Sequence, residues 1–412
     1  MADLKTITLG CRLNKFESEV IRELGHDVSL SDTIVINTCA VTAEAERQAR
    51  QAIRRAARDY PKSKIIVTGC AAQLNPSAFS VMKEVDRVLG NEEKLSAALL
   101  SESGPSIRVN DIMSVKKIAP HLIKGIKGRT RAFVQIQQGC DHRCTYCIIP
   151  FARGPNRSVG PKAVISQIRS LIESGYNEIV LTGVDICSYS SDGAYNLGSL
   201  IKLVLLELPN LKRLRLSSLD PAAIDETLLE LLGEEPRLMP HLHLSLQAMD
   251  DMVLKRMKRR HTRAGAIAIV AQVRALRPDV VFGADLIAGF PTETKLMFEN
   301  TVAAIKELDL TYLHVFPFSP RPGTPAAKMP LVENSLVKAR AAQLRAVGKI
   351  GLKRFLISRE GALEQVLVEK DRQGLSQHFA LVKLDFEATP GEIVKARVTA
   401  AGDGFLIASR AA

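Results

Sequence analysis

The chain has 412 residues, of which 46% are hydrophobic and 24% are charged. This length exceeds what one ordinary hydrophobic core supports, so two or three domains are expected. The composition excludes a disordered or low-complexity protein. No apolar run approaches the roughly 18 residues of a membrane-spanning helix, and the N-terminus lacks a secretion signal. We therefore expect a soluble, cytoplasmic and monomeric protein that does not bind a membrane.

The charge is markedly positive, with 56 Lys and Arg against 44 Asp and Glu and a formal net charge of +12. This excess favours an acidic partner, and nucleic acid fits better than a membrane because no basic amphipathic anchor is found. On charge alone, a generally basic enzyme is the alternative. Seven cysteines in a long chain without a secretion signal indicate metal or redox chemistry rather than a disulfide framework.

The first hundred residues alternate short apolar runs with helical stretches. The pattern predicts a small parallel α/β sandwich with strands at 5–10, 33–38 and 64–69, and an Ala- and Arg-rich helix over 43–60. Each predicted strand leads directly into a cysteine: Cys11, Cys39 and Cys70. Any one of them alone would more readily be a core residue. Because ligands bind beyond the carboxyl ends of parallel strands, the repeated placement predicts a three-thiol site.

A second alternation of strands and helices begins at residue 131. Its expected strands are 131–138, 178–184, 212–218, 241–247, 280–287 and 311–318. Six such units are fewer than the eight of a closed barrel, so a partial (β/α)6 barrel is predicted. After a helix near 333–357, a period-two pattern predicts a small antiparallel β-barrel. Such barrels often bind oligonucleotides, although a stabilising cap is the alternative.

The predicted fold class is α/β with three domains. An N-terminal domain covers 1–112, a basic linker covers 113–130, the partial barrel covers 131–357, and the small β-barrel covers 358–412.

The stretch "GCDHRCTYCIIPFARGPNRS", which begins at Gly139, holds a second group of three cysteines: Cys140, Cys144 and Cys147. Structural zinc usually takes four protein ligands. A cubane iron–sulfur cluster takes one thiolate per iron, so three thiolates leave one iron open to a substrate or cofactor. Zinc with three thiolates and a water, or with His142 as fourth ligand, is the alternative.

This CxxxCxxC spacing after the first barrel strand resembles the radical S-adenosylmethionine (SAM) enzymes, and the longer string resembles their methylthiotransferase branch. Other motifs resemble the same branch. Those of its N-terminal domain are "GCRLNKFESE" (10–19), "VINTCAVTAEAERQAR" (35–50) and "VTGCAAQ" (67–73). Those of its barrel are "HLSLQAMDDMVLKRMKRRHT" (243–262), "ADLIAGFPTET" (284–294) and "FPFSPRPGTPA" (316–326). The C-terminal β-barrel is placed like the branch's RNA-binding TRAM domain.

Within this branch, "GCRLNKFES" is most similar to the tRNA N6-threonylcarbamoyladenosine methylthiotransferases. Isopentenyladenosine enzymes more often read GCQMN at this point, and ribosomal-protein enzymes read GCPKN. The resemblance, together with the basic charge, favours a tRNA substrate. Methylthiolation of isopentenyladenosine tRNA or of a ribosomal protein is the alternative within the class. A non-catalytic RNA-binding protein with a structural metal centre is the alternative from another class.

The resemblance implies two [4Fe–4S] clusters. Cys140, Cys144 and Cys147 would hold the first, whose open iron takes the amino and carboxylate groups of SAM; its electron would produce a radical that abstracts hydrogen from carbon 2 of adenine. Cys11, Cys39 and Cys70 would hold the second, whose open iron carries the sulfur. A second SAM would supply the methyl group, so two SAM are used per product. The partners implied are a tRNA anticodon stem-loop and an electron donor such as a flavodoxin or ferredoxin.

Further cofactor contacts are implied residue by residue. Ordinary polar strand positions are the alternative for Ser245 and Gln247, and a solvated surface role is the alternative for Arg153 and Arg157. The methionine amino group would meet the backbone of Thr182, Gly183 and Val184, and the nucleoside would meet Ser245, Gln247, Asp285 and Gly289. Arg153 and Arg157 would bind a cofactor carboxylate or a tRNA phosphate. The basic runs 47–64, 116–131 and 255–263 are further candidates for phosphate contacts. Cys187 matches no motif cysteine and is expected not to be a ligand.

Overall fold

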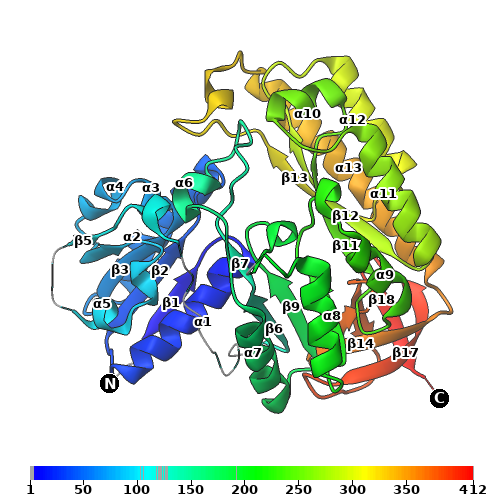
Figure 1. The fold of residues 1–412 in the computed structure, drawn as a ribbon, viewed down its shortest axis with the longest axis horizontal. Helices are drawn as coiled ribbons and strands as arrows, with labels where there is room; N and C mark the ends of the chain where they lie inside the picture. Colours follow the sequence, from blue (N-terminus) through cyan, green and yellow to red (C-terminus); the bar gives the residue numbers. More distant parts are fainter. Residues whose placement is uncertain are drawn as a thin grey trace.

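A computed structural model describes residues 4–102, 104, 106–116, 118, 123, 125, 129–191 and 193–411. Figure 1 shows an N-terminal group of elements at the left, a group of strands and helices in the centre and upper right, and a small barrel at the lower right. The predicted α/β class is thereby confirmed. Half of the residues of the predicted linker 113–130 lie outside the described part of the chain, and the domain boundaries stay predictions.

The N-terminal group is built on a five-stranded parallel sheet in the order β1-β2-β3-β4-β5. The three predicted strands are β1 (Lys5–Thr8), β2 (Thr33–Thr38) and β3 (Lys64–Gly69). The sequence analysis missed β4 (Arg87–Leu89) and β5 (Ile107–Arg108), because two or three residues are too few to show a period. The helices of this group are α1 (Arg12–Asp27), α2 (Ala43–Asp59), α3 (Cys70–Leu74), α4 (Ser77–Ser80) and α5 (Ala97–Ser101).

The central group holds six parallel strands in two sheets, with the orders β10-β9-β6 and β11-β12-β13. Isolated bridges join the sheets between Leu214 and Leu238 and between Leu219 and Leu244. The strands are β6 (Arg131–Gln135), β9 (Glu178–Thr182), β10 (Arg213–Leu216), β11 (His241–Gln247), β12 (Val281–Ala288) and β13 (Tyr312–Pro317). The predicted partial barrel is therefore confirmed.

Helices cover the outer face of this partial barrel. They are α7 (Pro161–Glu173), α8 (Leu197–Glu207), α9 (Glu226–Glu234), α10 (Asp251–Met257), α11 (Arg263–Leu276), α12 (Lys295–Glu307) and α13 (Asn334–Ser358). The largest apolar core lies between them and the strands, where alternate strand residues such as Leu242, Leu244 and Leu246 point outward. The residues between these, such as His243 and Ser245, therefore face the barrel interior.

The C-terminal residues form a closed five-stranded barrel in the order β14-β15-β16-β18-β17. Its strands are β14 (Leu363–Lys370), β15 (Gln373–Ser376), β16 (Leu381–Leu384), β17 (Ile393–Ala401) and β18 (Leu406–Arg410). The predicted small barrel is confirmed, although β16 and β18 pair in parallel and only the other neighbouring strands pair antiparallel. It contacts the N-terminal ends of the central strands. Arg131 pairs with Glu369 at 2.8 Å, and the Tyr312 hydroxyl donates to the His378 carbonyl at 3.1 Å.

Within the described part of the chain, no helix combines the length and the apolar character needed to cross a membrane.

Candidate cofactor and substrate site

The cysteines of the CxxxCxxC motif lie in a closed loop that follows the first barrel strand. β7 (Gln137–Gln138) pairs antiparallel with β8 (Arg157–Ser158) and so holds the two ends of the loop together. Gly139 has a φ of +73°, and a Cβ there would lie 1.8 Å from the Pro155 carbonyl oxygen, so only glycine fits. The Cys140 N–H donates to the Gly154 carbonyl at 3.1 Å. The loop therefore presents its thiols from a fixed frame.

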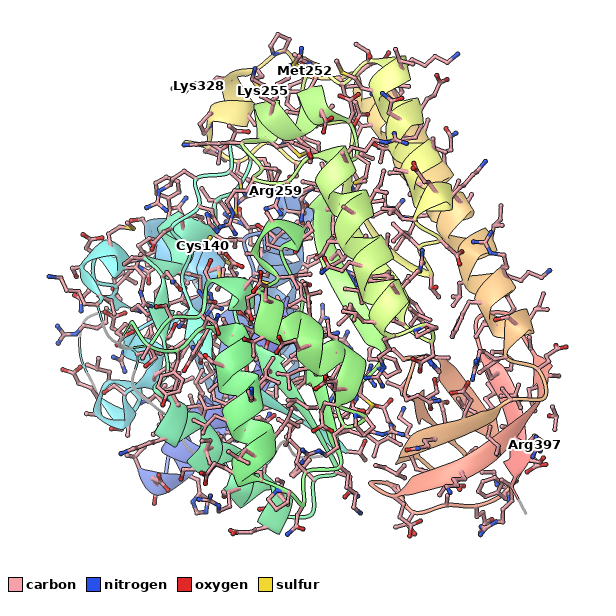
Figure 2. The ribbon with its side chains drawn as sticks, turned by 45° about the vertical axis from the view of Figure 1, so that its right-hand side comes forward. Cys140, Met252, Lys255, Arg259, Lys328 and Arg397 are labelled. Carbon is pink, nitrogen blue, oxygen red and sulfur yellow. The ribbon has the colours of Figure 1, made fainter. Side chains whose placement is uncertain are left out.

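The middle of this loop is anchored to the residues around the end of α10. The Thr145 hydroxyl donates to the Arg256 carbonyl at 2.8 Å, and the Thr145 N–H donates to the Met257 carbonyl at 3.0 Å. Arg259 places Nη1 3.9 Å from Cys144 Sγ and donates through Nη2 to the Ser245 carbonyl at 2.7 Å. Figure 2 labels Cys140 of this loop and Arg259.

Arg259 is a site residue that the sequence analysis did not single out. It belongs to the basic run 255–263, which was expected to contact phosphates, yet its side chain is buried and lies 3.4 Å from Asp220. Lys255 and Lys258 of the same run are exposed. The sequence carried no signal that separates them, because only tertiary packing decides which cation turns inward.

The three loop thiols form a donor set that suits metal ligation. The pKa of Cys140 is raised to about 11 and that of Cys147 to about 12, mainly by burial and partly by the neighbouring Cys144 thiol. Such thiols stay protonated until a metal deprotonates them. The His142 ring lies 3.0 Å from the Asp185 carboxylate, and Cys140, His142 and Asp185 could together hold an ion. That group has one thiol and differs from the three-thiolate set of the zinc alternative.

The other three predicted ligands stand at the ends of three adjacent strands, as expected. Cys11 caps α1 after β1, Cys39 follows β2 directly, and Cys70 begins α3 after β3. Cys39 and Cys70 are buried and Cys11 is exposed. The pKa of Cys39 is raised to about 12, mainly by burial and partly by the neighbouring Cys70 and Cys11. Burial likewise raises the pKa of Cys11, and Cys70 contributes to that rise. The three thiols thus lie close enough to act on one another.

Arg153 lies beside this second group of cysteines. Its side chain is buried, and its Nε donates to Cys70 Sγ at 3.1 Å. It also pairs with Glu17 and donates to Asn14. Lys94 donates to the other Glu17 oxygen at 2.6 Å. Although burial acts to raise it, Arg153 and Lys94 hold the pKa of Glu17 down to about 2.

A buried cation next to a thiol stabilises the thiolate form that metal ligation needs. Arg153 therefore places a buried positive charge beside a cysteine of the predicted second site, and its predicted contact with a cofactor carboxylate or a tRNA phosphate stays a prediction. Arg157 is also buried and donates to the Val115 and Pro155 carbonyls, both at 3.3 Å; its predicted contact with a cofactor carboxylate or a phosphate stays a prediction.

Replacing Arg153 with Met should lower the free energy of unfolding by about 3–5 kcal/mol, because Glu17 would keep a buried charge with only Lys94 beside it. Chemical denaturation of the two proteins measures this difference. Arg47→Met is the matched control, since Arg47 pairs with Glu44 at 2.6 Å on the exposed face of α2. That control should change stability by less than about 1 kcal/mol. Equal effects of the two substitutions would contradict the assigned role of Arg153.

One helix connects the two groups of thiols. α6 (Ile149–Arg153) begins two residues after Cys147 and ends at the arginine that contacts Cys70. Ile148 and Ala152 pack in the same apolar cluster as Cys70. The N-terminal sheet edge and the CxxxCxxC loop are therefore held against each other.

The barrel interior next to these groups is polar. His243 on β11 places Nε2 3.0 Å from Asp285 Oδ1 on β12, and His314 on β13 places Nδ1 3.2 Å from the same oxygen. Although burial acts to raise it, the hydrogen bonds from the two imidazoles keep the pKa of Asp285 well below its usual range. Asp285 is thus a carboxylate inside the barrel. Its predicted adenosine contact stays a prediction.

The remaining predicted contacts fall at strand ends and on the inner face. Thr182 ends β9, and the N–H of Val184 donates to Gln137 Oε1 at 2.8 Å, with Gly183 between them. Ser245 and Gln247 occupy inward positions of β11, and Gln247 has a φ of +67° beyond a register shift. Their cofactor contacts stay predictions.

Gly289 has a packing reason for its identity. Its φ is +72°, and a Cβ there would lie 2.5 Å from a Val337 methyl of α13. The close approach of α13 to the end of β12 requires glycine at this position. An adenosine contact of Gly289 stays a prediction.

Cys187 lies outside both groups. It is partly buried against the main apolar core, and burial raises the pKa of its thiol. Its expected lack of a ligand role stays a prediction.

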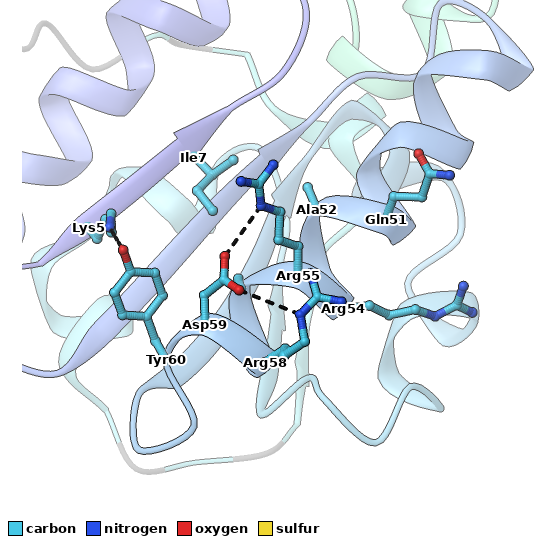
Figure 3. A pocket seen from close by; sticks show the side chains of 10 residues that line it. Lys5, Ile7, Gln51, Ala52, Arg54, Arg55, Arg58, Asp59 and Tyr60 are labelled. Carbon is cyan, nitrogen blue, oxygen red and sulfur yellow. Dashed lines mark hydrogen bonds and ion pairs between the residues drawn. The ribbon is translucent and has the colours of Figure 1, made fainter.

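A separate hollow lies at the edge of the N-terminal sheet, between β1 and the end of α2 (Figure 3). Arg54, Arg55 and Arg58 line it together with Lys5 and Tyr60. Asp59 pairs with Arg55 at 3.3 Å and with Arg58 at 3.6 Å. The hollow is therefore a cationic surface with an aromatic ring, within the predicted basic run 47–64.

Comparisons with known proteins agree with this arrangement. The model of the radical SAM superfamily matches residues 134–305, which include the CxxxCxxC loop. The model of the uncharacterized protein family UPF0004 matches residues 3–90, which include the other three cysteines. The threonylcarbamoyladenosine tRNA methylthiotransferase MtaB of Rickettsia prowazekii is 49% identical over 402 residues, covering 97% of this chain and 96% of that protein. This chain belongs to the radical SAM methylthiotransferase family.

A second member of the methylthiotransferase family, MtaB of Aquifex aeolicus, is 33% identical and covers 94% of this chain and 98% of its own length. Among solved structures, the radical SAM methyltransferase TsrM from Kitasatospora setae superposes with a TM-score of 0.58 at 14% identity, covering 79% of this chain and 77% of that one. The latter likeness shows the fold. Membership of the radical SAM superfamily implies that this methylthiotransferase-family chain uses a [4Fe–4S] cluster and SAM.

Proposed function

We propose that this protein is an enzyme that adds a 2-methylthio group to N6-threonylcarbamoyladenosine in tRNA, next to the anticodon. The observation that carries the proposal is the pair of three-thiol groups linked by α6 at the mouth of a polar barrel. The relatives that match nearly the whole chain at 49% and 33% identity bear the name of this activity. No observation on this chain favours isopentenyladenosine, a ribosomal protein or a non-catalytic role.

We assign the SAM-binding [4Fe–4S] cluster to Cys140, Cys144 and Cys147, and a second [4Fe–4S] cluster to Cys11, Cys39 and Cys70. When bound, the first would supply the electron that cleaves SAM and the second the sulfur that is inserted. Two SAM molecules would be consumed per product, one for the radical and one for the methyl group. Both donor sets fit, since each offers three free thiols with a guanidinium beside one of them.

The residues of the chain itself have distinct parts in this proposal. Arg153 places its guanidinium 3.1 Å from Cys70 Sγ, and Arg259 places its guanidinium 3.9 Å from Cys144 Sγ, so each set of three thiols has one cation beside it. The inner face of the barrel, with Asp285 between two imidazoles, offers hydrogen-bond partners to a polar base and ribose. On the outer face of the strands, leucines such as Leu242 and Leu244 pack against the helices and exclude water from that face.

Exposed cations support a tRNA partner. Arg54, Arg55 and Arg58 on α2 can contact phosphates, and each such contact adds salt-sensitive affinity. Figure 2 shows Lys255 and Lys328 at one end of the molecule and Arg397 of the C-terminal barrel at the other. We propose that the C-terminal barrel binds a part of the tRNA distant from the target base. We also propose a cytoplasmic monomer reduced by a flavodoxin- or ferredoxin-like donor.

The direct test uses the reconstituted protein, SAM, a reductant and two anticodon stem-loop RNAs. One RNA carries threonylcarbamoyladenosine and the other carries isopentenyladenosine at the same position. Mass spectrometry of the digested RNA should show the methylthio group only on the first. Modification of the second RNA alone, or of neither RNA while SAM is consumed, would contradict the proposed function.

A further inference from the structure

One face of helix α1 packs against the inner side of the partial barrel. Phe16 and Val20 of α1 pack in one apolar cluster with Phe133 and Val180, which lie on the inner faces of β6 and β9. Arg12 stands four residues before Phe16 and so shares that helix face. The Arg12 side chain, half-buried, is therefore directed toward the barrel interior.

Contacts with one ring fix the position of Arg12 more closely. Phe379 extends from the C-terminal barrel, and its ring stacks on His241 of β11 at 4.9 Å. The guanidinium carbons of Arg12, Arg131 and Arg215 lie 6.0, 5.3 and 5.0 Å from the centre of that ring. Three cations thus surround one aromatic side chain inside the barrel.

Arg12 differs from the other two arginines in its partners. Arg131 pairs with Glu369 at 2.8 Å, and Arg215 pairs with Glu178 at 2.9 Å. Among the described residues, Arg12 has no carboxylate within ion-pair distance. The carboxylate of Asp285, on the same inner face, already accepts from two histidines. The interior therefore holds a guanidinium whose counter-ion the described part of the chain does not supply.

The fork of a guanidinium matches a carboxylate, to which it donates two parallel hydrogen bonds. The base in the proposed function carries threonine on N6 through a carbamoyl group, and this threonine keeps a free carboxylate. Ring atom N1 lies between carbons C2 and C6 of adenine, so the N6 substituent and the reacting carbon C2 share one edge of the base. Arg12 adjoins Cys11, a ligand in the proposed sulfur site.

We propose that Arg12 binds the threonyl carboxylate of the target base and thereby selects it over bases with uncharged N6 substituents. This inference rests on the proposed function and adds the source of its specificity. Asp285 would repel a carboxylate, so the threonyl hydroxyl or a carbamoyl N–H faces the Asp285 side. The bound carboxylate then directs the C2 edge of the base toward the cysteine that Arg12 follows.

The test compares two anticodon stem-loop RNAs that differ by one charge. The first carries threonylcarbamoyladenosine, and the second carries its methyl ester. In the wild-type enzyme, kcat/KM for the ester should be about 10- to 100-fold lower, the range expected when a charged hydrogen-bonded pair is lost. In Arg12→Gln the two RNAs should react alike. Arg12→Lys keeps the positive charge but not the forked pair of donors. Its ratio of kcat/KM for the free acid to kcat/KM for the ester should therefore lie between the ratios of the wild type and of Arg12→Gln.

Controls separate this role from a structural one. Arg22→Gln changes an arginine of the same helix that pairs with Glu19 outside the barrel, and it should keep the wild-type ratio. Iron content and SAM cleavage without RNA should be unchanged in Arg12→Gln. If Arg12→Gln loses iron, Arg12→Lys is the variant that tests the inference. An acid-to-ester ratio of kcat/KM in Arg12→Lys equal to that of the wild type would overturn the inference.

The outcomes also distinguish this inference from the proposed function. If the wild-type enzyme modifies the free acid and Arg12→Gln still discriminates against the ester, Arg12 does not bind the carboxylate and the proposed function stands. If Arg12→Gln instead raises the KM for SAM without RNA, Arg12 serves the cofactor and the inference is wrong. If the wild-type enzyme modifies neither RNA while cleaving SAM, the proposed function itself fails.

Discussion

Replacing Cys144 with Ala should reduce the reductive cleavage of SAM by at least about a thousandfold, because thiolates that hold one cluster act as a unit and fail together. Cys144 stands between Cys140 and Cys147 in a loop fixed at both ends. No other thiol of that loop can therefore take its place. Chromatographic measurement of 5′-deoxyadenosine, with dithionite as reductant, gives the rate directly.

The matched control for this change is Cys187→Ala. Cys187 is a partly buried cysteine that belongs to neither group, and its removal should leave the cleavage rate within about twofold, as for a substitution away from the site. A Cys144→Ala protein that still forms 5′-deoxyadenosine at the wild-type rate would contradict the assignment of the SAM-binding cluster.

Replacing Cys39 with Ala should spare the cleavage of SAM and abolish methylthiolation of the RNA. SAM cleavage should persist, since the CxxxCxxC loop keeps all its thiols, whereas methylthiolation of the RNA should fall to the detection limit. Cys39 is 8% exposed at the end of β2, so alanine fills nearly the same space and the sheet should stay folded. Parallel assays of 5′-deoxyadenosine and of the modified nucleoside measure the two activities in one sample.

Two results would contradict the prediction for Cys39→Ala. A normally methylthiolated product from Cys39→Ala would show that Cys11, Cys39 and Cys70 are not needed for sulfur insertion. Loss of both activities, together with a lowered unfolding midpoint, would instead show that Cys39 serves the core of the N-terminal sheet.

The sequence predicted the strands best where an apolar run was bounded on both sides. β2 and β3 begin and end at the predicted residues, and so does β11. The placement of Cys11, Cys39 and Cys70 after three strands and the close spacing of Cys140, Cys144 and Cys147 then divided six cysteines into two groups. Both steps depend on local patterns, because a strand's period and a ligand spacing are readable within a few residues.

Side chains that act across elements could not be predicted in this way. Arg153 was predicted to contact a cofactor carboxylate or a phosphate, and Arg259 belonged to a basic run, yet each side chain is largely enclosed beside a cysteine from a distant part of the chain. A buried arginine is unusual unless it is paired, and the partners Glu17 and Asp220 are separated from these arginines by more than a hundred and by about forty residues. Only the packing of α6 on α3 and of β11 beside β10 brings them together.

The direction of the Arg12 side chain could not be predicted from the sequence either. Its motif, "GCRLNKFES", favoured one branch of the family, but the sequence did not say where the arginine points. The packing of α1 on the inner faces of β6 and β9 supplies that direction. A residue that marked a subfamily in the sequence thereby became a candidate for substrate selection.

The central claim is that the chain holds two independent three-thiolate clusters. Iron and acid-labile sulfide per chain, measured after anaerobic reconstitution of the wild type and of a Cys140/Cys144/Cys147 triple-alanine variant, test it most directly. About eight irons should fall to about four in the variant, since each cubane holds four. About four falling to none would show that Cys11, Cys39 and Cys70 hold no cluster, and the proposed source of sulfur would be wrong.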